Sequence, residues 1–242
     1  MARVRCVLFD IDGTLLDSND AHAHAWQSAL FAHGCDAPST LIRTMLGSEG
    51  GRGLLDRFGI LPRSPLESSI LARRAQLFSR CIGELGPFRG ARVLVDRLRS
   101  RGLVCCAVSC AESTEVHALL DAAGIDDLID VLVTGDDDRA ESHALEIALE
   151  RVGVSPSESV YVGDAPADIA LGLRAGVAVI ALRCGGVWRD QDFEGASAIY
   201  DDPEDLSHNL DRSPLALDRG SAPAAVDARE RTALPIALTC SR

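Results

Sequence analysis

The sequence predicts an α/β fold in which a doubly wound, mainly parallel, Rossmann-like sheet carries an inserted all-helical cap domain. Short apolar runs recur along the 242 residues, and helical patterns separate most of them. One interval, from about 19 to 86, shows helical periodicity and no convincing strand. Alternating strands and helices are typical of parallel sheets, because parallel strands need crossover connections, so a strand-free interval indicates an insertion.

Six apolar segments have the length and composition of strands that are buried on both faces of a sheet. They lie at 4–9, 103–108, 131–133, 160–162, 177–182 and 197–200. Three stretches between them carry apolar residues at helical spacing and are predicted to cover the sheet. Their apolar stripes are Val93, Leu94 and Leu98; Val116, Leu119, Leu120 and Ala123; and Ala144, Ile147, Ala148 and Val152.

The same patterns divide the chain into regions. Residues 1–18 and 87–212 are predicted to form the core, and 19–86 the cap, which would lie over the carboxyl end of the first strand. Within the cap, the glycine-rich segment 46–53 is predicted to be a loop. Residues 213–242 are rich in Ser, Pro, Ala and Arg, which predicts a flexible tail.

Charge and composition restrict the partners. The net charge of −12 would repel nucleic acid and acidic membranes, so small molecules or cations are expected instead. The 8 cysteines lack the spacing of zinc or disulfide frameworks and are predicted to be buried, reduced thiols. The N-terminus lacks a signal-peptide core, and no run approaches the about 18 apolar residues of a membrane span. We therefore expect a cytoplasmic protein without a nucleic-acid or membrane partner; its oligomeric state does not follow from the sequence.

Aspartates follow two of the predicted strands at the points where those strands end. Asp10 and Asp12 close the first strand, and Asp164 follows the fourth, with Asp168 one helical turn later. Because the carboxyl ends of parallel strands share one edge, these carboxylates are expected around one crevice, with Ser109 from the second strand beside them. Each aspartate alone could cap a helix or a turn. The ordered set favours a Mg²⁺ site, because a cation would offset the repulsion between the carboxylates.

These motifs resemble those of the haloacid dehalogenase superfamily, in the group of phosphoglycolate phosphatase and β-phosphoglucomutase relatives that have a small helical cap. DIDGTLLDS is similar to the first motif, VSC with Ser109 to the second, and GDAPAD to the fourth. The resemblance covers about residues 4–210. Dehalogenases of the superfamily lack the second aspartate of the first motif, so Asp12 favours phosphate chemistry.

The resemblance implies a role for each motif residue. Asp10 would be the nucleophile that forms an aspartyl-phosphate, and Asp12 would protonate the leaving oxygen and later activate water. Asp10, the backbone carbonyl of Asp12 and Asp164 would hold Mg²⁺, with Asp168 in or just behind that shell. Ser109 would bind a phosphate oxygen.

The third motif of the superfamily is a lysine, and this chain has none: all 24 basic side chains are arginine. Aligning the helix that follows the motif puts Arg139 at the lysine position, as a phosphate-binding residue. Its planar guanidinium keeps the charge but differs in shape from a compact ammonium. Arg139 either does the work of the lysine, which we favour, or pairs with the acidic run at 136–138 and leaves the site impaired. With a different helix register it is only a surface charge.

Two cap residues are candidates for contact with the substrate. His22 lies just after the first motif, where β-phosphoglucomutase-like relatives have a histidine that faces the active site, and Arg52 of the glycine-rich segment could contact an anionic group. His22 could equally be structural, as His24 is expected to be. Trp26 is predicted to belong to the cap core, and Cys110, in the second motif, to be a small buried thiol.

The predicted function is that of a Mg²⁺-dependent phosphatase acting on a small phosphorylated metabolite. A phosphomutase of the β-phosphoglucomutase type shares every core residue and differs in its cap. A catalytically impaired binding or regulatory module would keep the same fold. Both stay open as alternatives, and the substrate does not follow from the sequence.

Overall fold

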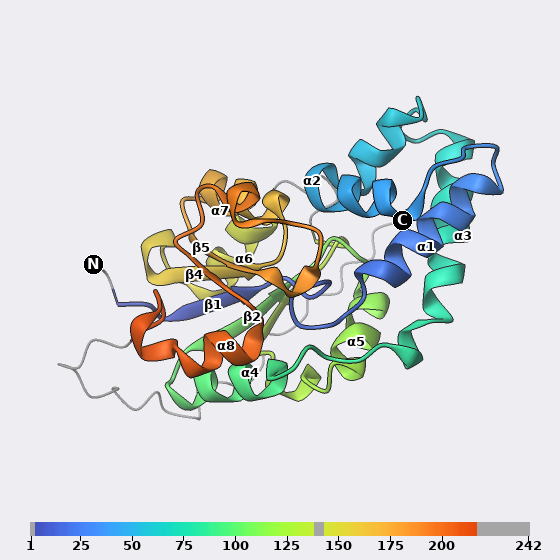
Figure 1. The fold of residues 1–242 in the computed structure, drawn as a ribbon. Helices are drawn as coiled ribbons and strands as arrows, with labels where there is room; N and C mark the ends of the chain where they lie inside the picture. Colours follow the sequence, from blue (N-terminus) through green and yellow to red (C-terminus); the bar gives the residue numbers. More distant parts are fainter. Residues whose placement is uncertain (1–2, 138–142, 217–242) are drawn as a thin grey trace, which may run out of the picture.

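The core is a six-stranded parallel sheet with the strand order β3-β2-β1-β4-β5-β6 (Figure 1). The structure, a computed structural model, describes residues 3–137 and 143–216. The strands are β1 Cys6–Phe9, β2 Val104–Val108, β3 Val131–Val133, β4 Ser159–Gly163, β5 Ala178–Leu182 and β6 Ala198–Tyr200. β1 is central, with Phe9 opposite Ala107 of β2 and Val162 of β4. Residues that follow these three strands therefore meet at one edge of the sheet, and the predicted fold class is confirmed.

Helices cover both faces of the sheet, because successive strand residues point to opposite sides and both sides are apolar. Val7 and Phe9 face one core, which includes residues of α4 (Ala91–Ser100), α5 (Ser113–Ala122) and α8 (Pro203–His208). Cys6 and Leu8 face the other core, with α6 (Ala144–Val152) and α7 (Pro166–Ala175). Figure 1 shows α4 and α8 on one side of the sheet and α6 and α7 on the other. Short 3-10 turns lie at Ile82–Glu84, Asp126–Leu128, Pro156–Glu158, Arg183–Gly185, Asp190–Phe193 and Leu210–Arg212.

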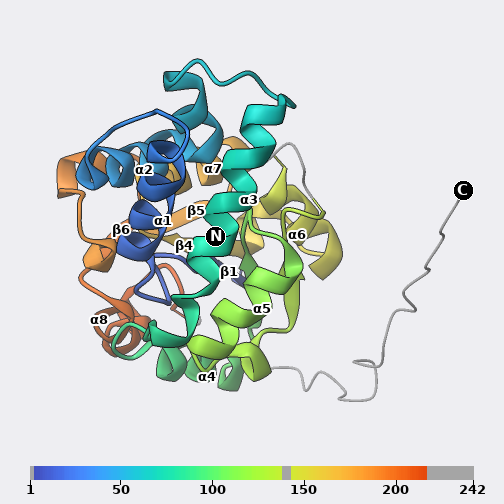
Figure 2. The same cartoon turned by 90° about the vertical axis from the view of Figure 1, so that its right-hand side faces the viewer.

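The insertion between β1 and α4 is helical and has a core of its own. It contains α1 (Asn19–Phe31), α2 (Ser39–Arg57) and α3 (Pro65–Ser79). Its buried residues include Trp26, Leu30, Ile42, Leu54 and Ile70. Figure 2, which looks onto the cap, shows the three helices over the sheet.

The two chain connections between core and cap lie side by side. Leu16 and Pro87 form an antiparallel bridge. Next to it, the N–H of Asp17 donates to the carbonyl of Gly86, and the N–H of Phe88 donates to the carbonyl of Leu15, both at 3.0 Å. The chain therefore enters and leaves the cap through one paired segment.

Two local predictions are wrong. The glycine-rich segment 46–53 is not a loop but part of α2, which kinks where Gly50 has a φ of 69°. Val93 is 57% exposed, because the buried face of α4 consists of Ala91, Leu94, Val95 and Leu98.

The packed fold also extends past 213, since Leu215 is fully buried in the core that contains α4 and α8. The rest of the predicted tail, 217–242, lies outside the described residues.

Within the described ranges, no helix has the length and the apolar character that crossing a membrane requires.

Candidate active site

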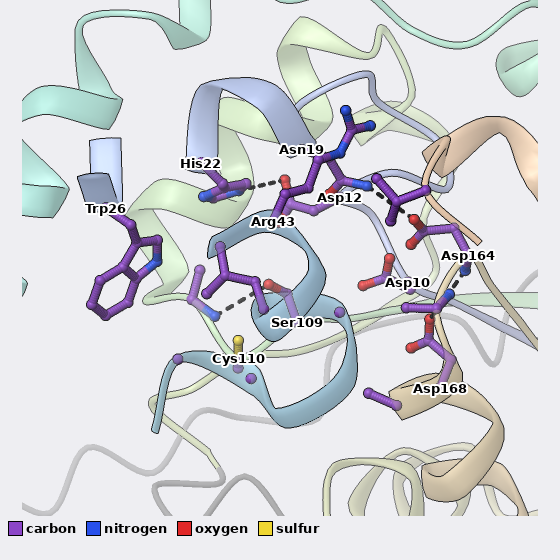
Figure 3. A pocket seen from close by; sticks show the side chains of 18 of the residues that line it. Asp10, Asp12, Asn19, His22, Trp26, Arg43, Ser109, Cys110, Asp164 and Asp168 are labelled. Atoms are coloured by element: carbon purple, nitrogen blue, oxygen red, sulfur yellow. Dashed lines mark hydrogen bonds and ion pairs between the residues drawn. The ribbon is translucent and has the colours of Figure 1, made fainter. Parts of the chain in front are cut away.

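A cavity of about 350 Å³ lies between the carboxyl edge of the sheet and the cap (Figure 3). The ends of β1, β2 and β4 contribute one side, and α1, α2 and α3 contribute the other. The residues that line it are Asp10, Asp12, Asn19, His22, Trp26, Arg43, Leu46, Gly47, Gly50, Gly51, Arg74, Ser109, Cys110, Ala111, Asp164, Ala165, Ala167, Asp168, Val187 and Trp188. The structure thus brings together the four aspartates, Ser109 and His22.

Asp10 follows β1 directly, and a tight turn fixes its side chain. Its N–H donates to the carbonyl of Val162 (2.9 Å), which extends the strand pairing by one residue. Gly13 turns the chain with a φ of 80°, a conformation that favours glycine, and the buried Thr14 hydroxyl donates to Asp10 Oδ2 (2.9 Å). Burial raises the pKa of Asp10 well above its usual value, and the charges of the other carboxylates, that of Asp168 first, raise it further.

Asp164 and Asp168 lie at the N-terminus of α7. Asp168 Oδ2 accepts the backbone N–H groups of Asp164 and Ala165 (3.0 Å each), and Asp168 Oδ1 accepts the hydroxyl of Tyr161 (2.8 Å). Asp164 Oδ2 accepts Nδ2 of Asn19, which belongs to the cap (2.9 Å). Burial raises the pKa of both carboxyls, and the charge of Asp168 adds to the rise at Asp164. Asp168 therefore orients the loop that presents Asp164.

Carboxylate oxygens of Asp10, Asp164 and Asp168 lie within 4.8 Å of one another. The backbone leaves room for them: a Cβ on Gly163 would lie 2.4 Å from the Asp168 carboxylate, and a Cβ on Gly185 would lie 1.6 Å from Asp164 Oδ2. Carboxylates held this close raise one another's pKa, which a bound cation would reverse. Hard oxygen ligands beside an open cavity suit Mg²⁺, which keeps waters and phosphate oxygens in its shell. This donor set fits magnesium.

Asp12 has a different environment from Asp10. Ser18 Oγ donates to Asp12 Oδ1 (2.5 Å), and Nε2 of His22 lies 2.9 Å from the same oxygen. Burial alone would raise the pKa of Asp12, but the charge and hydrogen bond of His22, the Ser18 hydroxyl and the charge of Arg74 outweigh it and lower that pKa. These two carboxyls, separated by one residue, thus have pKa shifts of opposite sign, because Asp10 lies among other carboxylates and Asp12 lies among hydrogen-bond donors and positive charge.

His22 is held from behind by α3. Arg74 Nη2 lies 2.6 Å from His22 Nδ1, and Phe78, one turn later, stacks on the imidazole with ring centroids 3.8 Å apart. Arg74 also reaches the core, where its Nη1 donates to both carboxylate oxygens of Glu115 in α5 (3.0 Å each). The side chains of this ion pair are only 16% and 14% exposed. A continuous series of contacts therefore joins Asp12 to Glu115 through the cap.

A second contact between cap and core lies beside the candidate metal ligands. Arg43 of α2 donates to the carbonyl of Gly185 (2.5 Å) and pairs with Asp20 of α1. Asn19 contacts the same carbonyl (3.4 Å) while it holds Asp164. The turn at Gly185 is therefore bound by two cap residues and lies against Asp164.

Ser109 ends β2 at the cavity. Its N–H donates to the carbonyl of Val133 (3.0 Å), and its hydroxyl accepts the N–H of Ala111 (3.2 Å), which leaves the hydroxyl proton for another acceptor. Cys110 is exposed and lines the cavity, because the chain leaves the sheet after Ser109; the prediction of a buried thiol is wrong at this position. Arg139, the predicted substitute for the lysine, lies outside the described residues.

The structure does not bring Arg52 to the cavity. Its guanidinium pairs with Glu67 and with Asp56 (2.7 Å) and donates to the carbonyl of Ile60 (2.6 Å), all within the cap. Among the described residues, the arginines that line the cavity are Arg43 and Arg74. Sequence reasoning missed both, because each is an ordinary charged position in a helical stretch, and such a pattern does not tell which charged residue faces the core.

Comparison with known proteins identifies the family to which the chain belongs. Residues 7–182 match the haloacid dehalogenase-like hydrolases. The chain is 28% identical over 221 residues to the N-acetylmuramic acid 6-phosphate phosphatase of Pseudomonas aeruginosa, an alignment that covers 87% of this chain and 96% of that protein. It is 32% identical over 179 residues to a phosphoglycolate phosphatase of Xylella fastidiosa, covering 72% of this chain and 77% of that protein.

Solved structures agree with the match. A hydrolase from Pseudomonas syringae, 28% identical, has a TM-score of 0.77 and covers 86% of this chain and 98% of its own. CbbY from Rhodobacter sphaeroides, in complex with phosphate, has a TM-score of 0.70 at 22% identity over 84% of this chain and 96% of its own, a likeness of fold alone. The family match covers the segment from β1 to the end of β5, including the insertion between β1 and α4. The protein belongs to the haloacid dehalogenase-like hydrolases, and the relatives named above from Pseudomonas aeruginosa and Xylella fastidiosa are phosphatases.

Proposed function

We propose that this protein is a Mg²⁺-dependent phosphatase that hydrolyses a small phosphorylated metabolite through an aspartyl-phosphate on Asp10. The observation that carries the proposal is the meeting of Asp10, Asp12 and Asp164 at one edge of the sheet, in front of a cavity that the cap covers. The relatives named as phosphatases of N-acetylmuramic acid 6-phosphate and of phosphoglycolate support it.

The reaction would take two displacements at phosphorus. In the first, an oxygen of Asp10 attacks phosphorus while the bond to the leaving oxygen breaks and Asp12 donates its proton to that oxygen. In the second, the Asp12 carboxylate takes a proton from water, the water oxygen attacks phosphorus, and the bond to Asp10 breaks. Inorganic phosphate leaves, and Asp12 carries a proton again. His22, 2.9 Å from Asp12, is suitably placed to exchange that proton.

The metal and phosphate contacts follow from the same geometry. Asp10, the backbone carbonyl of Asp12 and Asp164 would hold Mg²⁺, which supplies the positive charge that lets a carboxylate approach an anionic phosphate. Asp168 already accepts three hydrogen bonds, so we assign it to orienting Asp164 from just behind that shell. Ser109 is assigned to a phosphate oxygen through its hydroxyl proton. Arg139 is assigned to the phosphate in place of a lysine, which stays a prediction.

The test is phosphate release from an aryl phosphate and from a panel of phosphorylated metabolites, with Mg²⁺ and with chelator. The wild type should need the metal, and Asp10→Asn should lose all activity. Asp17→Asn is the matched control, because Asp17 belongs to the same motif but is exposed. Activity that persists in Asp10→Asn above background would remove Asp10 as the nucleophile.

Two further measurements separate the alternatives. A phosphomutase would convert a sugar phosphate into an isomer, whereas a phosphatase releases free phosphate. An impaired module would gain much activity from Arg139→Lys, whereas an enzyme adapted to arginine would change little or lose activity.

A further inference from the structure

The chain has two tryptophans, and both line the cavity. Trp26 belongs to α1 in the cap and is 5% exposed, and Trp188 follows β5 in the core and is half-buried. Figure 3 shows Trp26 at one end of the cavity and Asp164 and Asp168 at the other. A phosphate held at the aspartates would therefore direct the rest of its molecule toward Trp26, in a cavity that Trp188 also lines.

The glycine-rich part of α2 supports both indoles. A Cβ on Gly47 would lie 3.0 Å from Cζ2 and 3.1 Å from Nε1 of Trp188, and a Cβ on Gly51 would lie 3.0 Å from Cζ2 of Trp26. Both contacts are tighter than a side chain normally allows, so the helix backbone comes this near only because these positions lack side chains. Gly47 and Gly51 lie on either side of the kink at Gly50, so the backbone of α2 packs against one indole before the kink and against the other after it. The glycine-rich segment, which the sequence predicts to be a loop, thus provides the backbone surface against which two indole rings pack.

Charges on the cap side of the cavity are already offset. Arg43 pairs with Asp20, and Arg74 pairs with Glu115. A second anionic group on the substrate would therefore meet guanidinium groups that already have carboxylate partners. Apolar lining from Leu46 and Val187 adds to the two indoles.

We propose that Trp26 and Trp188 form a subsite for the leaving group, and that this subsite takes a single polar ring, as in a phosphorylated sugar or cyclitol, rather than a short linear carboxylate. The face of an indole carries partial negative charge and attracts the C–H groups on a sugar ring face. A volume of about 350 Å³ is near the lower end for ligand pockets, which suits one ring with its phosphate better than a nucleotide. The inference rests on the proposed phosphatase function.

The kinetic test compares three substrates in the full-length protein: glucose 6-phosphate, glycerol 3-phosphate and 2-phosphoglycolate. The wild type should prefer the ring substrate. Trp188→Leu should lower its kcat/KM about tenfold or more and change that of glycerol 3-phosphate less than about threefold, because only the ring reaches the indole. Phe31→Leu is the matched control, since Phe31 is an aromatic residue of α1 that is 68% exposed. An equal loss for all substrates would mean that Trp188 only closes the cap, and a wild-type preference for 2-phosphoglycolate would overturn the subsite.

A binding test does not depend on turnover. Because both tryptophans line the cavity, intrinsic fluorescence reports on it directly, and Trp26→Leu and Trp188→Leu each leave one reporter. Glucose 6-phosphate should change the emission of both variants in the absence of Mg²⁺, whereas inorganic phosphate should change it much less. No response to the sugar phosphate would overturn the subsite even if phosphatase activity were found. A response without hydrolysis of any phosphate would keep the subsite and remove the proposed function.

Discussion

The two sides of the cavity are built by different means. On the core side, Asp10, Asp164 and Asp168 follow strand ends: Asp168 accepts two backbone N–H groups, the Thr14 hydroxyl donates to Asp10, and glycines leave space for the carboxylates. On the cap side, His22 and Arg74 are held by other side chains, one of which belongs to the core. The core side is therefore positioned mainly by the strand ends, with Asn19 as its contact from the cap, whereas the cap side depends throughout on cap and core being docked.

Of these substitutions, Gly185→Ala should lower activity most, because the core side has no space for the new side chain beside Asp164. The new Cβ would fall 1.6 Å from Asp164 Oδ2, so the carboxylate or the turn must move. We expect kcat/KM to fall about 100-fold, together with a higher Mg²⁺ requirement, since displacements of about 1 Å at a catalytic group cost that much. Steady-state kinetics across a Mg²⁺ titration measure both. Gly83→Ala is the control, because a Cβ there would meet nothing within 4 Å. Unchanged kinetics in Gly185→Ala would mean that the turn at Gly185 does not constrain Asp164.

Glu115→Gln tests the contact by which the core holds the cap side. It removes the negative charge that Arg74 faces while keeping the size of the side chain, so Arg74 and His22 lose part of their support. Losing a shielded charge-assisted interaction should lower kcat about 10-fold to 100-fold, with a smaller change in KM. The exposed Glu112, at the start of the same helix, provides the control Glu112→Gln. Equal kinetics in the two variants would show that the Arg74–Glu115 pair does not support the site.

Arg43→Gln loosens the second contact between cap and core. It weakens the hydrogen bond to the carbonyl of Gly185, which Asn19 also contacts, so some docking is kept. We expect a rise in KM of about threefold to tenfold, measured with the same substrates. Arg57→Gln is the control on the same helix, because Arg57 is 65% exposed and pairs with Glu49 at 3.4 Å. A larger loss than that of Glu115→Gln would reverse the order of importance proposed here for the two contacts.

Arg52→Gln should have the smallest effect on activity and act on stability alone. Arg52 joins Glu67, Asp56 and the carbonyl of Ile60 inside the cap. Its loss should reduce the free energy of unfolding by about 1–3 kcal/mol, as expected for hydrogen bonds to a charged group, and leave kcat/KM of the folded protein unchanged. Thermal unfolding and kinetics at low temperature separate the two effects. A selective loss of catalysis would restore Arg52 as a substrate contact.

The sequence predicts the core side well and the cap side poorly, for a physical reason. Asp10, Asp12 and Asp164 follow apolar strands within a few residues, and parallel strands bring such positions to one edge. Arg74 and Glu115 meet only because two helices from different regions are docked, and no local pattern contains that information. His22 was identified through a resemblance, not through its own surroundings.

The prediction of a loop at the glycine-rich segment 46–53 is wrong for a related reason. Glycines usually indicate a turn, but Gly47 and Gly51 are required by the approach of two indoles, one from the cap and one from a distant part of the core. A propensity for loops was overridden by tertiary packing. The error at Val93 is smaller. The predicted apolar stripe has the helical period, but the buried face of α4 includes Ala91 and Val95 rather than Val93.

The chain leaves the core at Leu16 and returns at Pro87, and these two residues are paired neighbours. The two ends of the insertion therefore lie as close together as the ends of a short turn. The core can keep the same chain path whatever segment lies between them. Insertions are best tolerated where their two ends already lie close together. Genetic exchange of the segment between these points would therefore replace the cap side of the cavity and leave Asp10, Asp164 and Asp168 in place. The two sides of the cavity are in this way free to evolve at different rates within one gene.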